Sequence, residues 1–202
     1  MAIGQGAMLA TPIQVLNATA AIANGGTLYR PQLVKKVVDT AGSTVEEFKP
    51  EVIRQLPIDP ATIDIVRDGL WGAVNYPNGT AKTLSVPGVE VAAKTGTAEF
   101  YDPDIPLKPN KRLPTHAWFT AFAPFDNPEI AVVVFIYNGG EGSVAALPVA
   151  QEILRGYFAL KNPAVLPPEP SAGQAITPTE VITGPVAPIT STVPVTPAGE
   201  GG

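Results

Sequence analysis

Apolar positions in the first 162 residues recur with helical or strand periods, and three consecutive segments carry the strand pattern. The first is 89–98, the second is 116–123 and the third is 129–137, and turn residues such as Pro124 separate them. Consecutive strands joined by short connections usually pair antiparallel. We therefore predict an antiparallel meander in this order.

Two helix signals lie before these strands and one lies after them. Thr11-Pro12 pairs a hydroxyl N-cap with a proline suited to the first helical turn, which predicts a helix that ends near Asn24. Asp59-Pro60 begins a second helix in the same way, and 144–160 is a third. Between the first two, residues 28–48 read as an exposed hairpin. The predicted fold class is α+β: an antiparallel sheet meander flanked by helices, the last of which packs on one sheet face.

Two of these elements have more apolar surface than the others can cover. Every residue from Ile130 to Tyr137 is apolar, as in a strand buried on both faces, and the helix 12–24 is apolar around nearly its whole circumference. A long apolar sheet edge promotes aggregation. Either the segments within 28–56 cover both surfaces, or the chain is part of a larger domain, which we slightly favour.

The C-terminal segment has a different composition. Nine of the 23 prolines fall within 163–202, where apolar residues are isolated and follow no sustained period. Such a segment cannot bury enough apolar surface to offset its ordering entropy. We predict a folded part over 1–162 and a disordered, proline-rich tail over 163–202.

Charge and composition narrow the chemistry. The net charge is −5, which does not favour nucleic acid as a partner. Cysteine is absent, which excludes a thiol nucleophile. His116 is the single histidine, so a histidine-based metal site and a Ser-His-Asp triad are nearly excluded. We expect no metal and no cofactor. No apolar run in the chain is long enough to span a bilayer.

The chemically informative segment is Lys94-Thr95-Gly96, followed by Thr97, on the first strand of the meander. Lys94 supplies a fixed positive charge and the two threonines supply hydroxyl groups. Gly96 has no side chain, so a substrate backbone can approach the strand and add to its edge. Together these residues suit a substrate that carries a carboxylate. The alternative is an ordinary strand with a solvated lysine.

A Lys-Thr-Gly triplet is also a signature of penicillin-recognising serine enzymes. The surrounding segments resemble class B penicillin-binding proteins, in the order of that family and over about residues 1–160, and look closest to its elongation-type, penicillin-binding-protein-2-like group. The resemblance extends the fold class to the C-terminal portion of a penicillin-recognising transpeptidase domain. The segments that carry it are Ala2–Gly6, Thr11–Gln14, Ala21–Gly26, Ala93–Glu99, His116–Pro124 and Gly142–Ala146.

The resemblance implies a reaction: a serine attacks the penultimate D-Ala carbonyl of a peptidoglycan stem peptide, and the acyl-enzyme passes to an amine of a neighbouring strand. It implies that Lys94 and Thr97 are catalytic, and that Lys94, Thr95, Gly96 and Thr97 bind substrate. Lys94 would give electrostatic stabilisation, the threonine hydroxyls would hold the terminal carboxylate, and the Thr97 backbone N–H would enter the oxyanion hole. Stem peptides and β-lactams would be the ligands, at the extracytoplasmic face of the cell membrane.

The main departure from the family concerns the nucleophile. None of its five serines begins a Ser-x-x-Lys or a Ser-x-Asn pattern. We therefore expect a C-terminal piece of a transpeptidase that needs an upstream half, and with it a membrane anchor, and that is inactive in isolation. Two alternatives stay open: a fragment of a β-lactamase or β-lactam sensor, and a non-catalytic interaction module of the wall-synthesis machinery. His116 is expected to be a strand-end residue rather than a catalyst.

Overall fold

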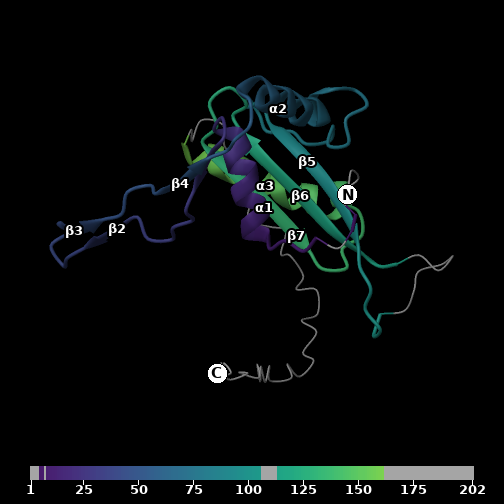
Figure 1. Ribbon diagram of the computed structural model, residues 1–202, viewed down its shortest axis with the longest axis horizontal. Coiled ribbons are helices and arrows are strands. Elements are labelled where there is room, and N and C mark those ends of the chain that lie inside the picture. The colour runs from purple at the N-terminus through teal and green to yellow at the C-terminus, as the bar shows by residue number, and fades with distance from the viewer. Residues whose placement is uncertain (1–4, 7, 106–112, 162–202) are drawn as a thin grey trace, which may run out of the picture. The chain divides into compact units, whose positions relative to one another are not determined.

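The computed structural model describes residues 5–6, 8–105 and 113–161 (Figure 1). The predicted disorder over 163–202 lies outside the described residues.

A three-stranded antiparallel sheet forms the centre of the fold, in the strand order β5-β6-β7. Gly96 of β5 lies opposite Trp118 of β6, which in turn lies opposite Phe135 of β7. The predicted meander is therefore confirmed in order and direction. Its strands are β5 (Ala92–Glu99), β6 (Thr115–Ala123) and β7 (Ile130–Ile136).

Helices cover both faces of this sheet (Figure 1). On one face α1 (Pro12–Ala23) contacts β6 and β7, and on the other α3 (Leu147–Lys161) packs against the same two strands. The helix α2 (Pro60–Asn75) contacts β5. All three predicted helices are present, but the last begins as one π-helical turn, η2 (Gly142–Ala146).

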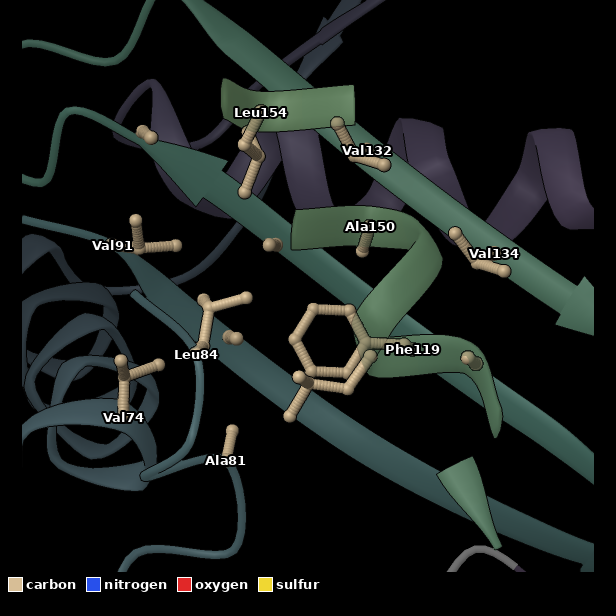
Figure 2. Packing of buried hydrophobic residues seen from close by; sticks show 14 of the residues in the cluster. Val74, Ala81, Leu84, Val91, Phe119, Val132, Val134, Ala150 and Leu154 are labelled. Atoms are coloured by element: carbon tan, nitrogen blue, oxygen red, sulfur yellow. The ribbon is translucent and has the colours of Figure 1, made fainter. Parts of the chain in front are cut away.

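The main core lies between the sheet and α3 (Figure 2). Phe119 of β6 is 1% exposed, and it packs in one cluster with Ala150 and Leu154 of α3 and with Val132 and Val134 of β7. Side chains alternate along a strand, so the neighbouring even positions of β6 face α1 instead.

A smaller core lies on the α1 face. There Phe122, which is fully buried, packs with Ala23 of α1 and Ala92 of β5. The strand β6 is therefore covered by side chains on both of its faces and by a strand at each of its edges.

Two hydroxyls join α1 to the sheet. Thr19 of α1 is buried, and its Oγ1 lies 2.8 Å from Oγ1 of Thr120 on β6. The Thr19 hydroxyl also reaches the carbonyl of Val15, and that of Thr120 reaches the carbonyl of Val132. Whichever hydroxyl donates to the other, the acceptor hydroxyl can donate onward to a carbonyl. This buried polar pair is therefore satisfied in either direction.

The region between α1 and α2 corrects part of the sequence-based prediction. The hairpin is confirmed for β2 (Lys36–Val38) and β3 (Thr44–Glu47), which are joined by a turn with Gly42 at a φ of +83°. However, β1 (Thr27–Tyr29) does not belong to that hairpin and pairs instead with β4 (Val52–Gln55). No strand was predicted over Val52–Gln55, because this short segment buries neither face and so lacks an apolar alternation.

The same region also decides between the two readings of the exposed apolar surface. β1 contacts α1, but every residue of β2, β3 and β4 is exposed and none of the four strands pairs with β7. Ile13 of α1 stays 51% exposed, and within the described residues the outer edge of β7 has no neighbouring strand. The reading in which 28–56 covers both surfaces is therefore wrong. Among the described helices, none is both long and apolar enough to cross a membrane.

The burial of α3 gives a stability prediction. Leu154 is fully buried whereas Leu160 of the same helix is 84% exposed. Leu154→Ala should lower the free energy of unfolding by about 2–5 kcal/mol, because it leaves a cavity between α3 and the sheet. Leu160→Ala is the matched control and should cost less than about 0.5 kcal/mol. Urea unfolding of the protein that carries this segment measures both, and equal costs would refute the described core.

Candidate active-site strand

One edge of β5 is free of strand pairing within the described residues, and the register of the sheet decides which backbone groups point there. The N–H of Phe100, next to the end of β5, donates to the carbonyl of Pro114, just before β6, at 3.1 Å. In an antiparallel pair, successive residues point their N–H and C=O groups to opposite sides. Even-numbered positions of β5 therefore face β6, and Thr95, Thr97 and Glu99 present their backbone groups at the free edge.

Hydrogen bonds from Gln5 confirm this assignment. Its Nε2 donates to the Thr97 carbonyl at 2.9 Å, and its Oε1 accepts from the Glu99 N–H at 3.1 Å. Gln5 has a long-range contact that no local pattern could predict. In the sequence it stood out only within the Ala2–Gly6 segment of the family resemblance.

The side chains of Lys94 and Thr95 also make contacts at this edge. Lys94 lies on the α1 face, yet its Nζ donates to the carbonyl of Thr95 at 2.5 Å and so reaches the edge. The Thr95 hydroxyl donates to the hydroxyl of Thr80 at 3.1 Å, which places a second threonine beside the strand. Thr80 follows α2 and was not predicted, because this contact again depends on tertiary packing.

A groove of about 530 Å³ runs along these residues. Lys94, Thr95, Gly96 and Thr97 all line it, so the structure brings the four predicted site residues to one concave surface. The remaining lining comes from the segment that leads into α1, from α1 itself, from the end of β5 and from the central strand: Met8, Ala10, Val15, Ala98, Trp118, Phe119 and Thr120.

Two glycines allow close backbone approach behind this groove. A Cβ at Gly96 would lie 3.0 Å from the Cβ of Trp118, so a larger residue at this position would crowd the central strand. A Cβ at Gly142 would lie 2.1 Å from the Trp118 carbonyl oxygen and 2.4 Å from that of Gly96. The η2 turn therefore packs its backbone directly against β5 and β6, which supports the strand from the side opposite α1.

An aromatic cluster lies at the end of the sheet where β6 begins. The ring of His116, the second residue of β6, stacks on Phe100 with a centroid distance of 3.8 Å, and its Nδ1 accepts from the Asn138 N–H at 3.3 Å. Burial lowers the pKa of His116 below its usual 6.5. This environment fits a strand-end residue that stays neutral.

A hydrogen bond ties the next loop to this cluster. The Tyr137 hydroxyl donates to Oδ2 of Asp102 at 2.5 Å. This bond lowers the pKa of the Asp102 carboxyl and raises that of the Tyr137 hydroxyl. The start of the loop after β5 is thereby fixed against the end of β7.

His116 gives a prediction that one NMR signal can test, because the chain has a single histidine. Its imidazole should titrate below pH 6.5, and Phe100→Ala should move the pKa back toward 6.5 by exposing the ring. With the folded pKa depressed, the neutral ring contributes stability above about pH 6.5, and this contribution is lost as the pH falls through the folded pKa. A titration at or above 6.5 in the unsubstituted protein would contradict the described packing.

Comparison with known proteins shows the family to which the chain belongs. The family described as penicillin binding protein transpeptidase domain matches residues 1–155. Peptidoglycan D,D-transpeptidase MrdA of Salmonella typhimurium strain SL1344 is 35% identical over 168 residues, which cover 77% of this chain and 26% of that protein.

Two solved structures show the same likeness. Pseudomonas aeruginosa PBP2, in complex with WCK 5153, is 34% identical with a TM-score of 0.61, over 77% of this chain and 32% of that one. The penicillin G acyl-enzyme complex of penicillin-binding protein A from Mycobacterium tuberculosis is 30% identical with a TM-score of 0.58, over 78% and 34%.

The chain belongs to the penicillin-binding protein transpeptidase family. Within it, the chain is part of a class B transpeptidase domain of the penicillin-binding-protein-2 type, as the resemblance predicted. The chain spans about a quarter of the length of the curated relative reported above.

Proposed function

We propose that this segment supplies the substrate-binding strand of a peptidoglycan D,D-transpeptidase. The observation that carries the proposal is the free edge of β5, which presents the backbone groups of Thr95 and Thr97 along a groove that Lys94 also lines. A peptide can add to such an edge by strand pairing, and the small Gly96 keeps the approach open.

Each residue then has a distinct task. The positive charge of Lys94 and the hydroxyls of Thr95 and Thr97 attract and hold the terminal carboxylate of a stem peptide or the carboxylate of a β-lactam. The Thr97 backbone N–H, which strand parity directs to the free edge, donates to the oxyanion that forms when a serine attacks the acyl carbonyl. The positive charge of Lys94 also stabilises this oxyanion electrostatically.

The nucleophile has to come from elsewhere, since no serine of this chain begins a Ser-x-x-Lys pattern. We propose that an upstream half of the domain supplies it, together with its activating lysine and a membrane anchor. The exposed side of α1 and the open edge of β7 are the surfaces that such a half would cover. The intact protein would then act at the extracytoplasmic face of the cell membrane.

Substitutions on β5 test the proposed roles in the full-length protein that carries this segment. Lys94→Ala and Thr97→Val should each slow acylation by a labelled penicillin roughly 10- to 100-fold, because each removes an interaction with a charged group. Lys36→Ala and Thr44→Val are matched controls on the exposed strands β2 and β3, and should leave the rate unchanged. Unchanged acylation in both β5 variants, with the fold intact, would remove these residues from the site.

The isolated chain gives a second prediction. It should form no covalent adduct with a penicillin, because its threonine hydroxyls have no activating base and the chain has no cysteine. Intact-mass spectrometry after incubation checks this, with the full-length protein as the positive control. A stoichiometric mass increase on the chain alone would show that it carries its own nucleophile.

A further inference from the structure

The side chain of Gln5 imitates a neighbouring strand on the free edge of β5. A carboxamide contains the same C=O acceptor and N–H donor as a peptide group. Gln5 uses both: it donates to the Thr97 carbonyl at 2.9 Å and accepts from the Glu99 N–H at 3.1 Å. In an antiparallel sheet these two groups, two residues apart, would bond to the N–H of one residue of the next strand and to the C=O of a residue two positions away.

This contact places Gln5 in competition with anything that pairs at the same edge. The Thr97 carbonyl borders the Thr97 N–H, which the proposed function assigns to the oxyanion. A substrate held there by an amide would therefore offer its own N–H to the Thr97 carbonyl. Gln5 has to leave that carbonyl first, and its carboxamide then has to exchange two hydrogen bonds with β5 for bonds with water.

We infer that Gln5 is a specificity-determining residue that occupies the amide-binding position of β5 and lowers the reactivity of acyl donors that need it. The inference rests on the proposed function. It concerns only ligands with an amide N–H beside the reacting carbonyl. Penicillin G has such an acylamino group, whereas imipenem has a hydroxyethyl group in its place, so the two compounds separate this effect from a general change in reactivity.

The test uses the full-length protein that carries this segment, with Gln5→Met as the main variant. Methionine keeps the length of the side chain and removes both hydrogen bonds. The rate constant for acylation by penicillin G should rise roughly three- to tenfold, which corresponds to the net value of one hydrogen bond. The rate constant for imipenem should change by less than about twofold. Gln32→Met is the control, because Gln32 is exposed and distant from β5 in the sequence. It should change neither rate constant.

Amide hydrogen exchange gives a readout that does not depend on acylation. The Glu99 N–H should exchange faster in Gln5→Met than in the unsubstituted protein, because it loses its acceptor. The same exchange rate in both proteins would overturn the inference.

Acylation that is slower with penicillin G, or that changes equally with both compounds, would also overturn it. If neither compound acylates the unsubstituted protein, the proposed function fails and the inference fails with it. Faster Glu99 exchange together with faster acylation by penicillin G alone is the result that supports it.

Discussion

The burial of β6 on both faces and at both edges is the constraint on which the site depends. Phe119 fixes one face of this strand in the core against α3, and Phe122 fixes the other face against α1. A one-residue shift of β6 would turn both rings to the opposite face of the sheet and remove each from the cluster that it fills. The register of β5 against β6 then follows, and it decides which residues of β5 turn their backbone groups outward.

This register places the backbone groups of the Lys-Thr-Gly-Thr segment where a ligand could bind. Since Thr95 and Thr97 turn outward, the residues on either side of Gly96 offer hydrogen-bonding groups to the groove rather than to β6. The same edge already holds the carboxamide of Gln5 and the ammonium of Lys94. In this account, selectivity for acyl donors is a competition between a substrate amide and a side chain for one carbonyl group.

The sequence predicts the elements that follow local rules. The helix after Thr11-Pro12 has the expected cap, in which the Thr11 hydroxyl accepts from the Gln14 N–H, and the three strands follow from their apolar runs and turns. The pairing of β1 with β4 was missed, because exposed strands have no apolar alternation to reveal them. The four site residues Lys94 to Thr97 were visible as a motif. Gln5 and Thr80 were not, since each meets β5 only after the chain has folded.

A crystal structure of the full-length protein acylated by penicillin G is the most direct test of binding at β5. We expect the ligand to lie along the free edge of β5, with its amide N–H bonded to the Thr97 carbonyl, its carboxylate near Lys94 and the threonine hydroxyls, and the Gln5 carboxamide displaced. A ligand that lies away from β5, with Gln5 still bonded to Thr97 and Glu99, would contradict it.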